Sequence, residues 1–314
     1  MKKQFVVAIV GPTACGKTAL SVEIAKALTG EIISADSMQI YRHMDIATAK
    51  PSLEERQGVP HHLMDFLDPA ERFSVADYCV LAKQAIEDIS GRGHLPVIVG
   101  GTGLYVDSLL NNVSYAEQKV DEALRAELQK ECEDFGVDYL LAKIREFDPA
   151  SYERLKTERN PKRIIRCIEV YRQEGKTQTE LNREALASKS PYKAAKIGLK
   201  ASDRQYLYDR IDRRVDKMLS DGLVREAQAY YQGNVGQTAS AAIGYKELKP
   251  YLEGEKSLEE CAENLKRATR RYAKRQLTWF LRDPAIRWFD IDEMSFDEIL
   301  LCSLKMIKDN FYEE

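Results

Sequence analysis

The sequence has few cysteines, and no two of them are close together. They are Cys15, Cys79, Cys132, Cys167, Cys261 and Cys302. Disulfide frameworks and structural zinc sites need closely spaced cysteines, so this scatter argues against both and fits the reducing cytoplasm. The longest apolar runs, residues 5–10 and 96–99, are too short to cross a membrane. We therefore expect a cytoplasmic protein without a membrane partner.

The sequence also lacks a large excess of charge, which at first argues against a nucleic-acid partner. The formal net charge is −3 over 314 residues. Net charge averages over local fields, however, and the basic residues are concentrated in two segments. Residues 154–183 hold nine Lys/Arg against four Glu, and residues 264–287 hold eight Lys/Arg against one Asp. The pattern therefore indicates two basic surfaces that the net charge conceals.

The order of the expected strands and helices predicts an α/β fold. The apolar run at residues 5–10 is typical of a buried parallel strand, and an amphipathic helix that Gly30 would end follows it. Ser74 and Asp77 form a capping-box pattern at the start of another helix. Strands are expected at residues 5–10, 31–34, 97–99, 196–200 and 286–289. Strands that alternate with helices form a parallel sheet whose ligands bind at the carboxyl ends of the strands.

The segment between the first strand and the first helix fits the phosphate-binding motif G-x-x-x-x-G-K-[ST]. It reads Gly11, Pro12, Thr13, Ala14, Cys15, Gly16, Lys17 and Thr18. The glycines let backbone N–H groups turn toward phosphate oxygens, and the helix N-terminus adds partial positive charge. Lys17 adds a full charge, and the Thr18 hydroxyl is a ligand for Mg²⁺. The motif predicts a bound di- or triphosphate and leaves open whether ATP binds.

Two features of enzymes that hydrolyse nucleotides are missing. The sequence contains no Asn-Lys pair, which excludes the base-reading motif of a GTPase. P-loop ATPases and kinases hold Mg²⁺ with an acid at a strand end. Here the strand at residues 97–99 ends in Gly100, Gly101, Thr102 and Gly103 instead. A phosphate loop without these parts suits a diphosphate that is bound and released rather than hydrolysed.

Between about residues 115 and 192 the pattern changes to helices only. Asn160 and Pro161 form the cap and first position of a helix that Gly175 ends. At 314 residues, 44% of them apolar, the chain can hold a core and an inserted unit. We predict a P-loop NTPase-like parallel-sheet core with basic C-terminal helices and an all-helical insertion. The expected bounds are 1–115 and 193–314 for the core and 116–192 for the insertion.

One acidic residue, Asp36, follows the second expected strand and shares a sheet rim with the phosphate loop. Three roles remain open from its position alone: a helix cap, a Mg²⁺ ligand through water, or a general base that faces the phosphates. Further along, Arg204 and Arg210 lie in a strongly charged helix, where Arg210 and Arg214 share a face. Either a phosphate-binding role or ordinary pairs with nearby aspartates fits that spacing.

Each of the two basic segments is expected to form a helix with its basic residues on one side. Lys162, Arg163 and Arg166 cover one side of the helix that begins at Pro161. In residues 266–280 the basic residues fill about half of the helix circumference, with aromatic residues on the other half. Basic runs with so few acids to pair with favour a surface that binds a polyanion over one that only faces solvent. Two such surfaces could hold a folded RNA.

Taken together, these segments resemble the bacterial tRNA dimethylallyltransferases, also called tRNA isopentenyltransferases or IPP transferases. The matching stretches are residues 11–18, 36–41, 45–51, 60–65, 99–105, 243–247 and 274–279, together with the Arg204/Arg210 helix. Two departures are small: Cys15 stands where Ser is usual, and Ala47 where Gly is common. The C-terminal zinc finger of eukaryotic relatives is absent.

The resemblance implies a reaction as well as a fold. The donor would be dimethylallyl diphosphate, and the acceptor would be N6 of the adenosine at tRNA position 37, just 3′ of the anticodon. Diphosphate would leave, Mg²⁺ would be the cofactor, and the helical insertion would touch the anticodon stem-loop. We expect the protein to act as a monomer.

The resemblance also implies roles for single residues. Asp36 would take the N6 proton, with Thr13, Lys17 and Arg204 as further catalytic residues. The phosphate loop, Arg204 and Arg210 would bind diphosphate, and Thr18 would hold the metal. Residues expected to contact tRNA are Asp36, Ser37, Met38, Gln39, Thr102, Arg125, Lys162, Arg163, Arg166, Ile243, Gly244, Tyr245, Arg271, Lys274, Arg275 and Trp279.

Three alternatives fit part of the pattern. A P-loop small-molecule kinase would use Asp36 to activate a hydroxyl but would not need two basic surfaces. A nucleotide-regulated RNA-binding protein would leave Asp36 without a role. An isopentenyltransferase acting on free adenine nucleotides would share the core and leave the insertion idle.

Overall fold

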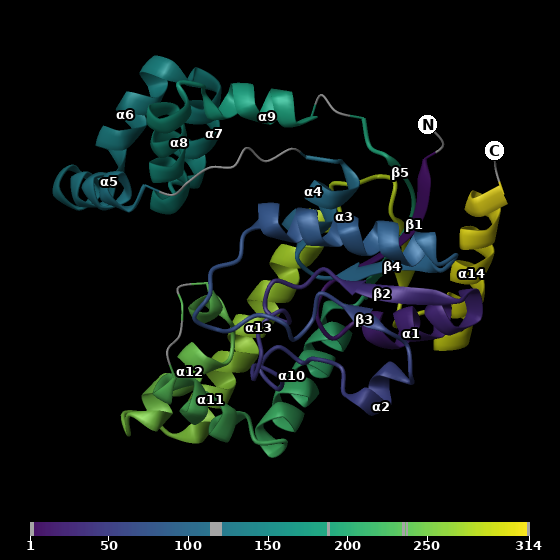
Figure 1. Ribbon diagram of the computed structural model, residues 1–314. Helices are drawn as coiled ribbons and strands as arrows, with labels where there is room; N and C mark the ends of the chain where they lie inside the picture. The colour runs from purple at the N-terminus through teal and green to yellow at the C-terminus, as the bar shows by residue number, and fades with distance from the viewer. Residues whose placement is uncertain (1–2, 114–120, 187–188, 234–235, 237, 313–314) are drawn as a thin grey trace. The chain divides into compact units, whose positions relative to one another are not determined.

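The computed structural model describes residues 3–113, 121–186, 189–233, 236 and 238–312 (Figure 1). The chain divides into two compact units. One is formed by Met1–Leu110 with Pro191–Glu314, and the other by Asn111–Ser190. The chain therefore leaves its first unit, builds a second one and returns.

A six-stranded sheet lies at the centre of the first unit. Its strands are β1 (Gln4–Val10), β2 (Gly30–Ser34), β3 (His61–His62), β4 (Leu95–Gly100), β5 (Tyr192–Lys200) and β6 (Arg287–Asp290). They are ordered β3-β2-β4-β1-β5-β6, and every neighbouring pair is parallel. The predicted parallel α/β core is confirmed. The short β3 was not predicted, because two histidines carry no apolar strand pattern.

Helices cover both faces of this sheet. The α-helices of the first unit are α1 (Lys17–Leu28), α2 (Leu53–Arg56), α3 (Val75–Gly91), α4 (Gly103–Leu110), α10 (Arg204–Ser220), α11 (Leu223–Gln232), α12 (Tyr245–Leu252), α13 (Leu258–Phe280) and α14 (Phe296–Tyr312), of which α1, α3, α4 and α14 pack against the sheet. Helices α1 and α14 pack together with Val7 and Ile9 of β1 in one apolar core. Helices α3 and α4 pack against β4 and each other, through stacked rings of Tyr78 and Tyr105. The predicted capping box of Ser74 and Asp77 opens α3.

The strand order determines where a ligand can bind. The central strand β1 lies between β4 and β5, and the phosphate loop follows it directly. The residues that follow β2 and β4 reach the same edge, since all these strands run in one direction. In open α/β sheets, ligands bind outside the carboxyl ends of the strands at such a point.

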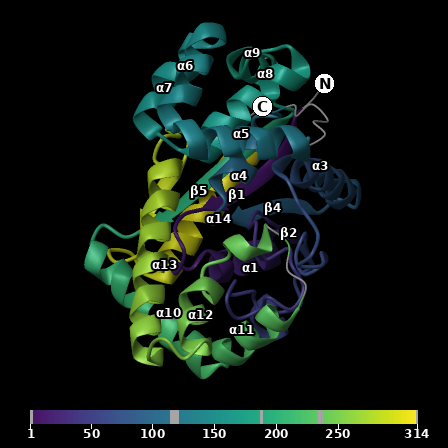
Figure 2. The same cartoon turned by 90° about the vertical axis from the view of Figure 1, so that its left-hand side faces the viewer.

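A second apolar core supports the loop after β2. Ile40, Tyr41 and Met44 of that loop are fully buried against Leu223 of α11 and Tyr245 of α12. Helices α10 and α13 lie side by side in both views (Figures 1 and 2). The C-terminal helices thus form a platform that holds the β2 loop at the sheet edge.

The second unit consists of helices throughout its described part. They are α5 (Glu122–Phe135), α6 (Val137–Phe147), α7 (Pro149–Glu158), α8 (Pro161–Glu174) and α9 (Gln178–Leu186). Its core includes Leu140, Ile144 and Ile164. As predicted, Asn160 caps α8, and Gly175 ends it with φ +65°.

Across the described segments, no helix combines the length and the apolar character needed to span a bilayer.

Candidate active site

The phosphate loop, residues 11–18, has a backbone that needs glycine at two positions. Gly11 has φ +140°, and a Cβ there would lie 2.3 Å from the carbonyl oxygen of Leu199. Gly16 has φ +93° and is the N-cap of α1. A side chain at either position would strain the backbone. The loop therefore curls at the N-terminus of α1, where the helix dipole stabilises an anion.

Two side chains of the loop donate to the same carbonyl oxygen. The Nζ of Lys17 donates to the carbonyl oxygens of Gly11 at 3.0 Å and Pro12 at 2.7 Å. Burial, together with the positive charge of Arg214, lowers the pKa of Lys17. The buried thiol of Cys15 also donates to the carbonyl oxygen of Pro12, at 2.8 Å, and lies 4.0 Å from the Nζ of Lys17. Only the backbone of Cys15 can therefore meet a ligand at this loop.

Helix α10 brings arginines to the phosphate loop. Arg210 donates from Nε to the carbonyl oxygen of Ala14 at 2.7 Å. Arg214, one turn further on, is half-buried; burial lowers its pKa, while the carboxylate of Asp36 raises it. Arg204, at the first position of α10, is exposed and has no ion pair within the described residues. Arg214 was not among the predicted site residues, although its four-residue spacing from Arg210 places both on one face of the helix.

Asp36 sits in a loop that is held from two directions. Its Oδ1 accepts the N–H of Met38 at 2.9 Å, which closes a tight turn. Thr102, after β4, accepts the N–H of Ser37 on its Oγ1 at 3.0 Å. The N–H of Thr102 donates in turn to the carbonyl oxygen of Ala35 at 3.2 Å. The predicted residues Asp36, Ser37 and Thr102 are therefore next to one another.

The half-buried carboxylate of Asp36 faces the cations of the phosphate loop. It interacts electrostatically with both Lys17 and Arg214. Tyr272 of α13 is also near: burial raises its pKa, and the negative charge of Asp36 raises it further, so its phenol stays neutral. One acid and several cations thus share the sheet edge, an arrangement in which a base can work beside a bound anion.

Gln276 of α13 is a site residue that the sequence analysis did not select. Its side chain is buried; it accepts the N–H of Thr13 at 2.9 Å and donates to the carbonyl oxygen of Gly101 at 3.1 Å. It lies in the family-like stretch 274–279, but no one-residue signal separates it from its neighbours. A glutamine directly after two basic residues, Lys274 and Arg275, has the pattern of a solvated position, and only its contacts with the two loops distinguish it.

The side chain of Trp279 makes contacts within the first unit. Its Nε1 donates to Asp107 Oδ2 at 2.6 Å, and burial raises the pKa of that carboxyl. A Cβ on Gly103 would lie 2.2 Å from the indole Cδ1. The ring therefore packs on the start of α4. The expected contact of Trp279 with tRNA stays a prediction. Because the ring is half-exposed, only its exposed part could contact RNA.

The predicted residues Ile243, Gly244 and Tyr245 lie against the loop at residues 45–47. The hydroxyl of buried Tyr245 donates to Glu226 Oε1 at 2.9 Å. The same carboxylate accepts the backbone N–H groups of Asp45, Ile46 and Ala47 at 2.9, 2.7 and 2.9 Å. This segment therefore helps to shape the loop that follows Asp36.

The loop after Asp36 is held on its other side by Gln39. The hydroxyl of Ser34 donates to Gln39 Oε1 at 3.1 Å. The amide Nε2 of Gln39 donates to the carbonyl oxygens of Thr48 and Ala49, each at 3.2 Å. Both ends of the Gln39 amide are thus used within the protein, and Met38 beside it is half buried.

The basic half of α13 is partly paired and partly free. Lys266 pairs with Asp216 at 2.8 Å, and Arg270 pairs with Asp212 at 3.0 Å. The remaining predicted cations are exposed, and no ion pair involves them within the described residues: Arg271, Lys274 and Arg275. An exposed row of unpaired cations suits a phosphate backbone.

In the second unit the predicted cations differ in their availability. Arg125 binds the buried carboxylate of Glu169 with two hydrogen bonds, at 2.6 and 2.9 Å, and Arg166 reaches the same carboxylate at 3.3 Å. Arg163 pairs with Glu158, and Lys162 is exposed. The guanidinium of Arg125 is thus already bound to a carboxylate of its own unit.

A small polar cavity lies beside Thr18. Ser34, Gln39 and His61 line it together with Thr18, and its volume of about 20 Å³ is room for about one water molecule. The ring Nδ1 of His61 is 2.8 Å from the carbonyl oxygen of Val59, so the other nitrogen is the one left for this cavity. No group of three or more His, Cys, Asp or Glu within the described residues could hold a metal ion by itself.

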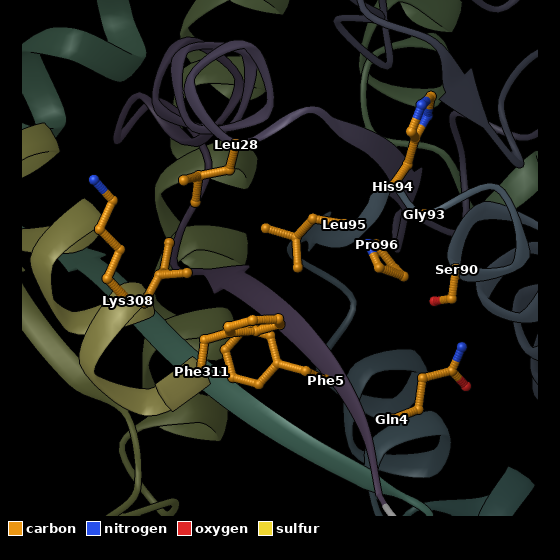
Figure 3. A pocket seen from close by; sticks show the side chains of 11 residues that line it. Gln4, Phe5, Leu28, Ser90, Gly93, His94, Leu95, Pro96, Lys308 and Phe311 are labelled. Atoms are coloured by element: carbon orange, nitrogen blue, oxygen red, sulfur yellow. The ribbon is translucent and has the colours of Figure 1, made fainter. Parts of the chain in front are cut away.

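A larger cavity of about 400 Å³ lies at the opposite edge of the sheet (Figure 3). Gln4 and Phe5 at the start of β1, Leu95 at the start of β4, and Phe311 of α14 are among the residues that line it. The rings of Phe5 and Phe311 meet edge to face at 5.2 Å. None of the predicted site residues lines this cavity.

Comparisons with known proteins agree with this arrangement. The family model described as IPP transferase matches residues 39–283, and the model described as isopentenyl transferase matches residues 4–68. A tRNA dimethylallyltransferase of Halalkalibacterium halodurans is 47% identical over 300 residues, which cover 95% of each chain. One from Bacillus subtilis is 47% identical over 294 residues, covering 92% of this chain and 91% of that one.

Solved structures show the same fold. The full-length tRNA isopentenylpyrophosphate transferase from Bacillus halodurans superimposes with a TM-score of 0.74 at 44% identity, covering 99% of this chain and 98% of that one. A eukaryotic dimethylallyltransferase acting on tRNA gives a TM-score of 0.80 at 31% identity, covering 98% of this chain and 79% of that one. A phosphate loop, an adjacent carboxylate and full-length similarity all agree, and the chain belongs to the IPP transferase family.

Proposed function

We propose that this protein transfers a dimethylallyl group from dimethylallyl diphosphate to N6 of adenosine 37 of tRNA. The observation that carries the proposal is one carboxylate, Asp36, that interacts electrostatically with Lys17 of the phosphate loop and with Arg214 of α10, beside a loop that lacks hydrolytic parts. A tRNA is the acceptor named for the curated relatives. The products are N6-dimethylallyladenosine and diphosphate.

The acceptor amine needs a base. The lone pair of an exocyclic adenine amine is delocalised into the ring, so the nitrogen is a poor nucleophile. As N6 bonds to the allylic carbon, the C–O bond of the donor breaks and its electron pair leaves with diphosphate. Asp36 takes the N6 proton. A positioned general base typically contributes about 10²–10⁴-fold to the rate.

The leaving diphosphate gains charge as the C–O bond breaks. Backbone N–H groups of the phosphate loop, Lys17, Arg210 and Arg214 are the groups that would stabilise this charge. Because burial lowers the pKa of Lys17 and of Arg214, both cations gain when an anion binds between them. Fixed charges of this kind need no reorganisation in the transition state. Arg204 is exposed at the first position of α10, so it is a weaker candidate for stabilising the diphosphate.

Mg²⁺ fits this site through Thr18. Its hydroxyl is exposed and has no hydrogen-bond partner within the described residues, and hard hydroxyl and phosphate oxygens are the ligands Mg²⁺ prefers. Thr18 would hold the ion together with the oxygens of the diphosphate. When bound, Mg²⁺ supplies positive charge at the leaving group.

The tRNA would be held by the exposed cations. Arg271, Lys274 and Arg275 of α13 contact the phosphate backbone, and the Lys162–Arg166 face of α8 contacts the anticodon stem-loop. The target base leaves its stack to reach Asp36, which costs a few kcal/mol, and contacts to the RNA offset that cost. The free cysteines fit a reducing cytoplasm, and we propose that the protein acts there as a monomer.

One incubation tests the function. The protein is mixed with bulk tRNA, Mg²⁺ and dimethylallyl diphosphate carrying label in the allyl group, and labelled tRNA is digested to nucleosides. We expect label in N6-dimethylallyladenosine. Asp36→Asn should lower the rate by about 10²–10⁴-fold while tRNA affinity stays within about threefold. Asp297→Asn, an exposed change on α14, is the matched control.

Two results would contradict the proposal. One is unlabelled tRNA together with label on free adenosine phosphates, which would indicate an enzyme for free nucleotides. The other is unlabelled tRNA with conversion of ATP to ADP in the presence of a small hydroxyl acceptor, which would indicate a kinase.

A further inference from the structure

A single amide side chain on α13 connects the two loops of the proposed site. Gln276 is 5% exposed. On one side it accepts the N–H of Thr13 in the phosphate loop at 2.9 Å, and on the other it donates to the carbonyl oxygen of Gly101 at 3.1 Å. An amide is one of the few side chains that can accept and donate at once, so both of its ends are used.

The space around Gln276 admits little variation. A Cβ on Gly101 would lie 1.9 Å from its Nε2, so the turn after β4 must remain glycine for the amide to approach. Thr13 and Gly101 would otherwise each leave a backbone polar group unpaired next to the site. Burying such a group without a partner costs about 1–3 kcal/mol.

The contact continues to the proposed base. Thr102, the residue after Gly101, accepts the N–H of Ser37 at 3.0 Å and donates to the carbonyl oxygen of Ala35 at 3.2 Å. Those two residues flank Asp36. Hydrogen bonds, together with the peptide bond between Gly101 and Thr102, therefore connect the phosphate loop through Gln276 to the loop that carries the base.

We propose, building on the transfer reaction above, that Gln276 is a positioning residue that sets the distance between the bound diphosphate and Asp36. The N–H of Thr13 points to Gln276, so the protein itself fixes this part of the phosphate loop. The acceptor nitrogen must approach the allylic carbon between these two loops. A misplacement of about 1 Å can cost about 10²-fold in rate without weakening binding.

The same helix presents the exposed cations Arg271, Lys274 and Arg275 on its outer side. A rigid helix that contacts RNA on one side and the phosphate loop on the other sets the depth at which the acceptor base meets the donor. Gln276 is the residue of α13 that contacts the phosphate loop and the turn after β4.

The first test replaces the amide with an apolar side chain of similar length. Gln276→Met should lower the single-turnover transfer rate about 10–100-fold, while the dissociation constants for tRNA and for dimethylallyl diphosphate change less than about threefold. Gln228→Met, on the exposed side of α11, is the matched control and should transfer at the parent rate. Loss of tRNA or donor binding in step with the rate would overturn the positioning role.

The second test gives a readout that a packing role would not move. In Gln276→Glu, a protonated carboxyl can still accept from Thr13 and donate to Gly101, whereas a carboxylate cannot donate. The rate of this variant divided by the parent rate should therefore rise severalfold as the pH falls from about 8 to about 6. If Gln276→Met does not fold, this ratio decides the matter alone.

A flat ratio across that pH range would overturn the inference. So would a parent-like single-turnover rate in Gln276→Met. Both results leave the proposed function intact as long as the parent enzyme labels tRNA. A parent that does not label tRNA refutes the function itself, and the positioning role falls with it.

Discussion

The Nε–H of Arg210 donates to the carbonyl oxygen of Ala14 at 2.7 Å, so helix α10 is tied to the backbone of the phosphate loop. Ala14 has φ +64°, in the left-handed region that a non-glycine residue adopts only when its surroundings require it. The arginine thus shapes the loop with one nitrogen, and we propose that its two terminal nitrogens bind the diphosphate. One side chain serves both loop structure and charge.

Replacing Arg210 should therefore damage donor use. We expect Arg210→Gln to lower kcat/KM for dimethylallyl diphosphate about 10²–10³-fold, because a charge that stabilises the leaving group is lost. Steady-state kinetics at saturating tRNA measure this. Arg213→Gln, an exposed change on the same helix, should leave kcat/KM within about twofold. Equal losses in both variants would rule out a specific role for Arg210.

The exposed cations of α13 should act through salt-sensitive binding. Removing one phosphate contact from a folded RNA lowers the slope of log Kd against log salt by roughly 0.7–0.9. We expect Lys274→Ala to reduce the slope by about that amount, with KM for the donor unchanged. Lys305→Ala on exposed α14 should leave the slope as it is. Filter binding at several KCl concentrations gives both values, and an unchanged slope for Lys274→Ala would remove α13 from the tRNA surface.

The architecture of the core could be predicted because its signals are local. The apolar run that became β1, the Gly11–Thr18 motif and the caps at Ser74 and Asn160 each depend on neighbouring residues. Gln276 and Arg214 could not be selected in the same way. Their importance arises from contacts with residues far away in the chain, and a charged helix has the same pattern whether one face meets solvent or a phosphate loop.

Arg125 has a structural contact that the sequence did not indicate. By family resemblance it was expected to contact tRNA, and a basic residue near a basic helix gives no warning of a buried acid. Glu169 is 2% exposed, and its carboxylate needs a cation nearby. A buried partner forty-four positions away in the chain is invisible to local pattern. Whether Arg125 also meets tRNA stays a prediction.

Acid stability should depend on Glu31. This buried residue of β2 accepts hydrogen bonds from Arg92 at 2.8 Å, and from His62 and His94 at 2.6 Å each. Burial alone would raise the pKa of Glu31, but these three donors hold it down to about 2. The unfolded chain has a Glu pKa of about 4.3, so the folded state is favoured fully above that value and loses this stabilisation as the pH falls toward 2.

The measurement compares the parent with Glu31→Gln by urea unfolding at several pH values. We expect the parent's advantage in unfolding free energy to be greatest above about pH 5 and to shrink as the pH is lowered to about 3. Glu293→Gln, at an exposed acid with no ion pair within the described residues, serves as the control. A constant difference between parent and Glu31→Gln would show that ionisation of Glu31 does not contribute.

Glu226 should matter for stability without touching the reaction centre. Its carboxylate accepts three consecutive backbone N–H groups, from Asp45, Ile46 and Ala47. In Glu226→Gln one oxygen becomes an N–H₂ group that faces these donors, so we expect a loss of about 1–3 kcal/mol in unfolding free energy. Glu263→Gln on α13, whose carboxylate is 60% exposed, should cost much less. Similar losses in both would mean that the loop has other support.

The place of β1 between β4 and β5 has a consequence for how the protein is made. The strand closest to the N-terminus acquires its second neighbour only after residues 192–200 have been synthesised, about 190 residues later. At roughly 5–20 residues per second this takes about 10–40 s on the ribosome. During that interval one edge of the most apolar strand has no partner from its own chain. The nascent protein therefore depends on what shields that edge, and a slow stretch of translation before residue 192 would lengthen its exposure.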